Sequence, residues 1–416
     1  VSYRESFVLP VPFRNWQDML TFDGWYTGAN GTGTKVAGAS GESIGVWNFR
    51  NDVTLYANWV NALSFEAIKK NNNIVGYKAE PGVDLNSVTE LTIPAQYNGL
   101  PILELGSFAG CGNLVKINIP NSITYLDTVT GFTSCNSLEA FNVYEVSGYK
   151  GEVLYTSYDG VLYYNNQVSD NAGWEVKFVP KKKSGECFVM EGTVNIPLKS
   201  FYGSKITSIN IPYTVKTIGA EAFYYSYLEN VTFDATPSTA KEEALTLENR
   251  AFAGCKSLTS ITLPRRVTSI ATGYEGYSSL SSFDYCDNLT SISVENGNKN
   301  YSSYDGVLYN RNKTELLIVP AGKSGDFTVR GGTIRIADYA FMNCKKITSV
   351  TISGSVLEIG ERAFYYCSKL NKVVFEDEND ETLTINEGAF YNCDLSSIVL
   401  PHNARVIKSN AFGSNS

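Results

Sequence analysis

The sequence of 416 residues contains one histidine, His402. Histidine is the commonest general base in enzymes and the commonest protein ligand of metals. Its near absence argues against most enzyme classes and most metal centres. We therefore expect no catalytic residue, no cofactor and no bound metal in this chain.

Basic runs and long apolar runs are also missing. Lys and Arg total 34 against 42 Asp and Glu, which gives a net charge of -8, and such a chain offers no dense positive charge to neutralise phosphates. No apolar stretch approaches the ~20 residues that span a bilayer. We expect no nucleic-acid partner and no insertion of this chain into a membrane.

Motifs for metals and phosphates are absent too. The cysteines lack the paired C-x-x-C spacing typical of zinc sites, and no glycine loop has the phosphate-binding pattern. A glycosidase stays open, because two carboxylates that face each other in a deep pocket leave no sequence motif. The acidic run "EDENDET" lacks the spacing of a calcium loop, so we interpret it as a solvated loop; its acids are Glu376, Asp377, Glu378, Asp380 and Glu381.

One pattern returns along the chain. The segment "AFAGCKSLTSITLP" from Ala251 recurs as "AFMNCKKITSVTI" from Ala340, "AFYYCSKLNKVVF" from Ala363 and "AFYNCDLSSIVLP" from Ala389. The repeat is about 23 residues long and contains a segment in which apolar and polar residues alternate, as in a strand with one buried face. Ten such segments begin at Val88, Leu114, Leu138, Ile206, Leu228, Leu258, Leu289, Ile347, Leu370 and Leu395.

A single strand and loop cannot bury an apolar face alone, so repeated units of this kind stack. We predict a mostly β fold, a right-handed solenoid with a parallel sheet along one side. The phenylalanine of each A-F-x-x-C step then lies in an aromatic column inside the coil. The column comprises Phe108, Phe132, Phe223, Phe252, Phe283, Phe341, Phe364, Phe390 and Phe412.

The cysteines share one position of the repeat. Ser226 and Ser204 fill the same position in other units, which indicates a packing role. We predict buried free thiols whose S–H groups reach buried carbonyls, and Cys187, outside the series, is predicted to lie in the core as well. The series comprises Cys111, Cys135, Cys255, Cys286, Cys344, Cys367 and Cys393.

The repeat signature "L-x-x-I-x-I-P…I-G-x-x-A-F-x-x-C" resembles that of BspA-like leucine-rich repeat surface proteins. The resemblance extends from about Phe65 to Ser416. It implies a leucine-rich repeat solenoid over residues 61–416, with an atypical N-terminal coil at about 61–87. The last segment, "HNARVIKSNAFGSNS", stops inside a repeat, which leaves open whether the array continues.

Two long units interrupt the array, at about residues 144–200 and 295–340. Both contain "SYDGVLY", then "VP", then "KSG". Asp-Gly between apolar and aromatic residues is a strong hairpin signal. We predict that each insert carries a β-hairpin, and the repetition of the two inserts favours a structural module over a unique active site.

Residues 1–60 differ in composition, because four of the five tryptophans, Trp16, Trp25, Trp47 and Trp59, lie there. Such a cluster indicates a separate small core. The segments "FDGWYTGANGTGTKV" and "DVTLYANWV" resemble the Listeria-Bacteroides repeat, a small β module of bacterial surface proteins. This copy begins after the family's usual opening strand. The resemblance implies a β-grasp-like module over residues 1–60.

Tyrosines are abundant in the turns of the repeat, whereas the outward strand positions are small, polar and nearly uncharged. Stacked turns would align these tyrosines along one edge, where they can supply amphipathic contacts to a partner. The alternative is that they only cover the surface of the coil. The candidate partner-binding residues are Tyr224, Tyr225, Tyr365, Tyr366 and Tyr391.

Resemblance to BspA-like proteins implies a non-enzymatic bacterial adhesin at the cell surface or outside the cell, where it acts as a monomer. Its expected partners are host extracellular or cell-surface proteins, other bacteria, or glycans. Two alternatives stay open. One is a cell-envelope scaffold or a glycan-binding module without catalysis; the other is a carbohydrate-active enzyme, which would require a deep pocket with facing carboxylates.

Overall fold

The computed structural model describes residues 5–10, 20–38, 41–82, 88–126, 131–132, 134–167, 172–272, 281–376 and 380–415. These residues form strands and turns, with one 3₁₀ turn, η2 (Ala29–Gly31), as the only helical element among them. The chain divides into two compact units, Val1–Asn165 with Lys177–Lys183, and Asn166–Val176 with Ser184–Ser416. The boundary expected between residues 60 and 61 stays a prediction.

The first unit begins with a small antiparallel sheet in the order β2-β1-β3. Phe22 is buried against Trp25 and Trp59, with ring centroids 5.8 and 5.5 Å away. Trp47 belongs to a separate aromatic cluster, and Trp16 lies outside the described residues. The strands are β1 (Leu20–Tyr26), β2 (Lys35–Ala37) and β3 (Tyr56–Asn61).

An antiparallel hairpin of β4 (Leu63–Lys70) and β5 (Asn73–Pro81) follows. Its turn residues Asn71 and Asn72 adopt φ values of 51° and 63°, which suit a tight hairpin turn because asparagine tolerates the left-handed region. The strand β5 then pairs in parallel with the next coil. The other strands of this sheet are β7 (Gln96–Tyr97), β8 (Leu100–Leu105) and β10 (Tyr125–Leu126).

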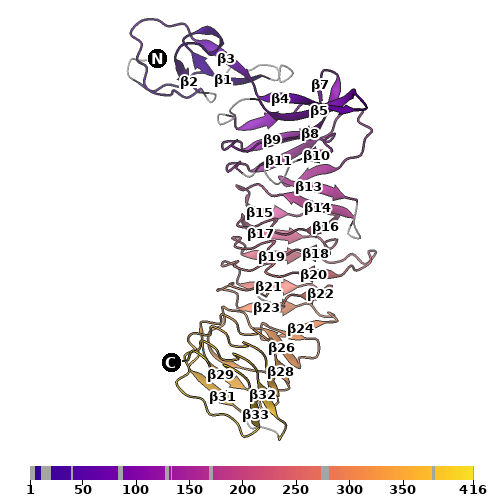
Figure 1. Cartoon of the computed structure of the whole chain (residues 1–416), viewed down its shortest axis with the longest axis vertical. Coiled ribbons are helices and arrows are strands. Elements are labelled where there is room, and N and C mark those ends of the chain that lie inside the picture. Colours follow the sequence, from indigo (N-terminus) through magenta and orange to yellow (C-terminus); the bar gives the residue numbers. More distant parts are fainter. Residues whose placement is uncertain are drawn as a thin grey trace. The chain divides into compact units, whose positions relative to one another are not determined.

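Parallel strands follow in each unit, at the predicted one-strand-per-repeat positions and once more in each insert, and Figure 1 shows them stacked in the second unit. In the first unit they are β6 (Glu90–Thr92), β9 (Lys116–Pro120) and β11 (Ala140–Tyr144). In the second they are β15 (Ser184–Phe188), β17 (Lys205–Ile211), β19 (Asn230–Phe233), β21 (Ser260–Leu263), β23 (Ser291–Val294), β27 (Gly325–Thr328), β29 (Ile347–Ile352) and β31 (Lys372–Phe375).

A second series of short parallel strands forms another face of the coil in the second unit. One sheet contains β14 (Gly173–Phe178), β16 (Thr193–Ile196), β18 (Thr217–Ile218), β20 (Leu245–Leu247) and β22 (Val267–Ile270). Another contains β26 (Glu315–Ile318), β28 (Arg335–Ile336), β30 (Glu358–Ile359), β32 (Leu383–Ile385) and β33 (Ala404–Ile407). The fold is therefore the predicted solenoid of stacked coils.

The predicted strand segments all form strands except the last, which begins at Leu395. Elsewhere the leucine or isoleucine that opens the strand follows the repeat cysteine by three residues, as in Cys367 and Leu370. Leu395 follows Cys393 by only two. The same two-residue link precedes Ile206 and Leu228, after Ser204 and Ser226, and strands form there, so the link does not account for the difference. In this segment Leu395 is buried and Val399, at an outward position, is 85% exposed. The prediction of a strand at this position was wrong.

Both inserts carry the predicted hairpin. The strands are β12 (Tyr155–Tyr158) with β13 (Val161–Asn166) in one insert, and β24 (Tyr301–Tyr304) with β25 (Val307–Asn310) in the other. The Asp-Gly residues form the turns, with φ of 48° at Asp159 and 48° at Asp305. Each turn aspartate accepts a lysine ion pair from the same insert, at 2.9 Å from Lys183 and 3.0 Å from Lys323.

The predicted phenylalanine column is present in both units. Phe364, in the middle of one run, stacks on Phe341 at 4.3 Å and on Phe390 at 4.7 Å, with the rings nearly parallel. The coil at Phe201 joins the column too, 4.9 Å from Phe223. These rings are fully buried, and each aromatic side chain removes a large apolar area from water.

The repeat cysteines are free and buried, as predicted. Six of the seven thiols donate to the carbonyl of a residue one coil earlier, and in five of them that residue is the phenylalanine of the column. The Sγ–O distances are 3.3 Å from Cys135, 3.2 Å from Cys255, 3.1 Å from Cys286, 3.5 Å from Cys344, 3.0 Å from Cys367 and 3.2 Å from Cys393. Ser226 occupies the same position and lies 3.3 Å from the Cys255 sulfur.

We expect Phe364→Ala to lower the free energy of unfolding by about 3–5 kcal/mol, because it leaves a cavity between two stacked rings. Phe412→Ala is the matched control: Phe412 is half-buried and stacks on one ring, Phe390, at 5.4 Å. Urea unfolding followed by circular dichroism measures both. Equal losses would show that the column does not stabilise the coil through two-sided stacking.

We expect four thiols to resist modification in the folded protein. Burial raises the pKa of Cys255 to about 12 and raises the pKa of Cys286, Cys344 and Cys367 well above the usual value, and the thiolate is the reactive species. A disulfide reagent at pH 8 should leave these four unmodified and should titrate all eight cysteines after unfolding in urea. Fewer thiols in urea would reveal a disulfide.

Candidate functional site

The A-F turns of the second unit share one backbone geometry. The residues two before and two after the phenylalanine adopt left-handed φ values; around Phe364 these are 48° at Arg362 and 59° at Tyr366. Their N–H groups bond the next coil, with 2.9 Å from Arg362 N to Glu387 O and 3.2 Å from Tyr366 N to Tyr391 O. These backbone groups of the turn are therefore hydrogen-bonded to the next coil, and the side chains of the turn project from a fixed backbone.

One tyrosine cluster lies on the turns at Phe201 and Phe223. The Tyr224 ring lies 4.3 Å from Tyr225 and 5.6 Å from Tyr202. Glu221 accepts ion pairs from both neighbouring coils, 3.3 Å from Lys199 and 3.3 Å from Arg250. Tyr225 is 43% exposed and Tyr202 is 52% exposed, so the cluster presents aromatic surface next to a charged network.

A second tyrosine cluster lies on the turns at Phe341, Phe364 and Phe390. Tyr365 contacts Tyr339 at 6.4 Å, Tyr366 at 4.4 Å and Tyr391 at 5.7 Å between ring centroids. The Arg362 guanidinium lies 5.8 Å from the Tyr365 ring centroid and donates a hydrogen bond of 2.8 Å to the Tyr339 hydroxyl. The cation and the rings therefore hold one another in place.

The hydroxyls of Tyr224 and Tyr365 stay protonated at neutral pH. Burial, with hydrogen bonding to Tyr225, raises the pKa of Tyr224 to about 12. Burial, with hydrogen bonding to Tyr366, also raises the pKa of Tyr365. These hydroxyls can therefore both donate to and accept from a ligand.

The predicted binding residues thus fall into two groups. The structure brings Tyr224 together with Tyr225, and Tyr365 together with Tyr366 and Tyr391. Sequence reasoning missed three participants, Tyr202, Tyr339 and Arg362. Tyr202 follows Phe201 as Tyr224 follows Phe223, so the repeat alignment could have identified it. Tyr339 and Arg362 precede their phenylalanines, at a position whose side chains vary from coil to coil.

The outward strand face is small and polar, as expected, and its side chains bond one another. Asn118 donates to the Glu90 carboxylate at 2.9 Å and to the Thr92 hydroxyl at 3.0 Å, and it accepts from Asn142 at 2.9 Å. In the second unit, Asn210 donates to Asp234 at 3.1 Å. These ladders stabilise the stack and leave fewer polar groups for a ligand.

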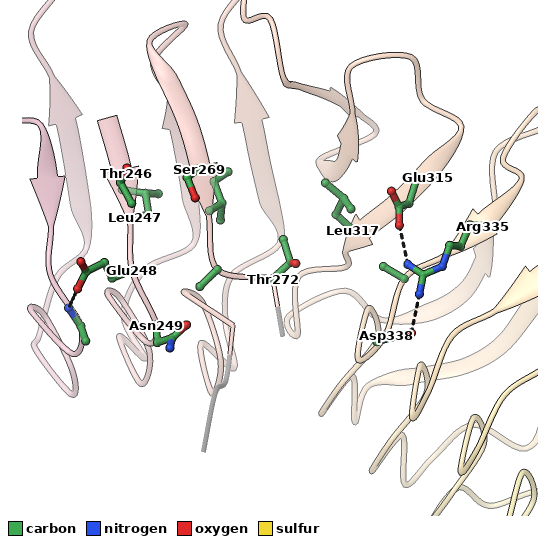
Figure 2. A pocket seen from close by; sticks show the side chains of 14 residues that line it. Thr246, Leu247, Glu248, Asn249, Ser269, Thr272, Glu315, Leu317, Arg335 and Asp338 are labelled. Carbon is green, nitrogen blue, oxygen red and sulfur yellow. Dashed lines mark hydrogen bonds and ion pairs between the residues drawn. The ribbon is translucent and has the colours of Figure 1, made fainter. Parts of the chain in front are cut away.

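Two of the described cavities are lined by three carboxylates each. In one, of about 370 Å³, Glu242 pairs with Arg265 at 2.6 Å and Glu295 accepts a 2.9 Å hydrogen bond from the Arg265 backbone. The other, shown in Figure 2, has a volume of about 490 Å³. Arg335 binds Glu315 at 2.6 Å and Asp338 at 2.7 Å. Glu248 accepts a 2.9 Å hydrogen bond from the backbone of Ala220. Figure 2 shows Glu315 and Asp338 both engaged by Arg335, and Glu248 engaged by the neighbouring coil, so this pocket does not present the free, facing pair that glycoside hydrolysis requires.

One sequence pattern that resembles a catalytic serine motif is not among the predicted sites. Residues 41–45 read G-E-S-I-G, which matches the letters of a nucleophile elbow. That motif activates serine only on a sharp turn between a strand and a helix. Here Ser43 forms an isolated bridge with Ala37, and its hydroxyl accepts a hydrogen bond from the backbone of Phe7 at 3.2 Å. Ser43 is therefore part of a β-bridge here and does not lie on a nucleophile elbow.

Other candidate features give no site within the described residues. They contain no group of three or more His, Cys, Asp or Glu positioned to hold a metal ion. Of the acidic run, Asp377 and Glu378 lie outside the described residues, and Asp380 lies 3.7 Å from His402. No helix in the described part of the chain has the length and apolar character needed to cross a bilayer.

Comparison with known families gives one match. The model described as the BspA type leucine rich repeat region matches residues 83–157, 194–305 and 326–416 in six copies. The unmatched stretches between these ranges contain the hairpin turns of the inserts or the segments that follow them. No curated protein matches the chain.

One of the solved structures that are similar to this chain shares its fold. A leucine rich cell surface protein from Faecalibacterium prausnitzii is 22% identical, with a TM-score of 0.51 over 85% of each chain. The pneumococcal vaccine antigen PcpA is 20% identical, with a TM-score of 0.45 over 84% of this chain and 76% of the antigen. A leucine-rich repeat protein from Bacteroides ovatus is 17% identical, with a TM-score of 0.41 over 85% and 91%.

Asp284, a buried aspartate on the turn at Phe283, should make the free energy of unfolding depend on pH. Asp284 follows Phe283 as Tyr224 follows Phe223, and burial raises its pKa to about 7, although the charge of Arg250 lowers it. A carboxyl with a raised pKa stabilises the fold when protonated, and that contribution is lost as pH rises from about 4 to about 7.

Asp284→Asn should remove this contribution to the pH dependence. Urea unfolding at pH 5 and pH 8 should show a larger loss of stability with rising pH in the wild type than in the variant, by a few kcal/mol at most, since one pKa unit corresponds to about 1.4 kcal/mol. Parallel pH profiles in the two proteins would contradict the assignment.

Proposed function

Because this chain belongs to the family of BspA-type leucine-rich repeat proteins, we propose that it is a non-enzymatic bacterial surface or secreted protein that acts by binding. Its role is that of an adhesin for host proteins, host cells or other bacteria. The proposal rests on the family and on one structural observation, the two exposed tyrosine clusters on the A-F turns.

The tyrosine clusters have the properties of binding anchors. Tyr225 and Tyr366 are 43% and 41% exposed, on backbone positions fixed by hydrogen bonds to the next coil. Tyrosine gives a large amphipathic contact with few rotatable bonds, so little conformational entropy is lost on binding. A rigid frame with aromatic side chains therefore supports binding better than the internally bonded strand face does.

Weak contacts at such sites add up when many copies of the protein share one surface. When several binding sites are linked, the apparent affinity rises without any new contact, provided that the sites can bind their ligands at the same time. Display on a bacterial surface would supply this condition. The proposed adhesion is therefore multivalent, with modest affinity at each cluster.

The alternative function is a cell-envelope scaffold without a specific ligand. The ladder of Asn118, Glu90 and Asn142 supports it, because this face stabilises its own stack. A scaffold would not depend on the exposed tyrosines, and the two functions can therefore be separated by changing them.

The test is a solid-phase screen of the chain, as monomer and on multivalent beads, against extracellular-matrix proteins, mucins and a glycan panel. We expect the beads to be retained on at least one ligand class and the double variant Tyr365→Ala, Tyr366→Asn to lose most of that retention. Both substitutions copy residues found at the same turn positions, Ala253 and Asn343, so the turn should fold.

The outcomes separate the alternatives. Thermal unfolding of the double variant close to that of the wild type confirms that the loss is local. Retention that survives in the variant places the binding site elsewhere. No retention of the wild type in either format favours the scaffold.

A further inference from the structure

We propose that the hollow lined by Tyr365 and Tyr391 is a subsite for one residue of an uncharged glycan. The hollow has a volume of about 260 Å³ and is lined by Arg362, Tyr365, Glu387, Gly388, Tyr391 and Asn410. This inference rests on the proposed binding function and gives it a ligand class at one tyrosine cluster.

The two stacked tyrosine rings that line the hollow suit one face of a sugar ring, which would pack beside the pair. Tyr365 and Tyr391 come from consecutive coils, with centroids 5.7 Å apart and planes inclined by 29°. Both rings are half-buried, so their orientation is set by packing and not by the ligand. Weakly polar C–H groups of a ligand pack on such rings with the apolar contact energy of an aromatic face.

The polar lining offers donors and acceptors close to these rings. The Arg362 guanidinium is held by the Tyr339 hydroxyl at 2.8 Å and by Glu361 at 3.2 Å. Glu387 and Asn410 are exposed at the rim. A carboxylate accepts, a guanidinium donates, and an amide does both. Adjacent hydroxyl groups, each a donor and an acceptor, match this mixture.

The charges of the lining favour a neutral ligand. Arg362 is the cation of the hollow and Glu387 its anion, and Glu361 pairs with the same arginine. An anionic ligand would face both carboxylates, and a cationic ligand would face the arginine. The volume lies below the ~300–1,000 Å³ of pockets that enclose drug-sized molecules, so the site fits one unit of a longer chain.

Gly388 opens the floor of the hollow. It has φ of 59°, the left-handed value of its turn position, and a Cβ atom added there would lie 3.2 Å from the Arg362 Cγ and 3.7 Å from the Tyr391 Cβ. Other coils carry Glu221, Arg250 or Asn410 at this position. A side chain at Gly388 would therefore project between Arg362 and Tyr391, two of the residues that line the hollow.

The experiment uses the whole chain and isothermal titration calorimetry. The probes are neutral hexasaccharides of glucose, mannose, galactose and N-acetylglucosamine, with heparin as the anionic comparison. The test variants are Tyr391→Ala and Gly388→Asn, which copy Ala253 and Asn410 at equivalent positions. The matched control is Tyr227→Ala, the same change at an exposed tyrosine outside the hollow and outside both tyrosine clusters.

We expect at least one neutral hexasaccharide to bind, with affinity reduced about tenfold or more in both test variants and nearly unchanged in the control. Binding that all three variants share, or binding of heparin alone, would overturn the subsite. If the chain is retained on proteins or cells but no hexasaccharide binds or competes, the glycan assignment fails and the adhesin survives. If nothing is retained, both fail.

Discussion

Hydrogen bonds between successive coils are the interaction on which the rest of this structure depends. The strands pair in parallel, and the A-F turns pair as well, with every second N–H of the turn bonded to the next coil. This regular pairing keeps equivalent residues one above another. Three features follow from it, because each requires equivalent repeat positions of neighbouring coils to lie in contact. They are the phenylalanine column, the thiol-to-carbonyl bonds and the asparagine ladders.

The same pairing imposes left-handed backbone at two positions of each turn, and this shapes the surface. Glycine and asparagine occupy several of these positions, but Tyr225, Arg362 and Tyr366 adopt the same conformation. Such residues carry a cost of order 1 kcal/mol or more, which the backbone bonds and the packing of the turn offset. Lys199, Glu221 and Arg250 adopt the same conformation at equivalent positions, so the left-handed backbone is a property of the coil pairing whatever side chain the position bears.

The interior was predictable from sequence because it repeats. A buried column needs the same residue type at the same interval, so Phe364 or Cys367 can be assigned from any one unit. The Leu395 segment keeps the alternation of buried and exposed side chains without forming a strand. Its spacing from Cys393 does not account for this, because Leu228 follows Ser226 at the same interval in a segment that does form a strand. The clusters of the turns were predictable only in part. The tyrosines after the phenylalanine follow the repeat, whereas the partnership of Arg362 with Tyr339, and the opening at Gly388, arise between side chains of different coils.

The two hairpin inserts limit how far unfolding can spread from coil to coil along the array. In the second unit the turn at Gly306 accepts a hydrogen bond from Ile292 of β23, so the hairpin takes the place that the next strand of that face would occupy. A repeat array opens from its ends by losing one neighbour at a time. A hairpin closed on itself by an Asp-Gly turn and a lysine ion pair does not depend on the next coil in that way. Under a pulling force the array should therefore lengthen in steps, each step ending at a hairpin and leaving the coils beyond it wound.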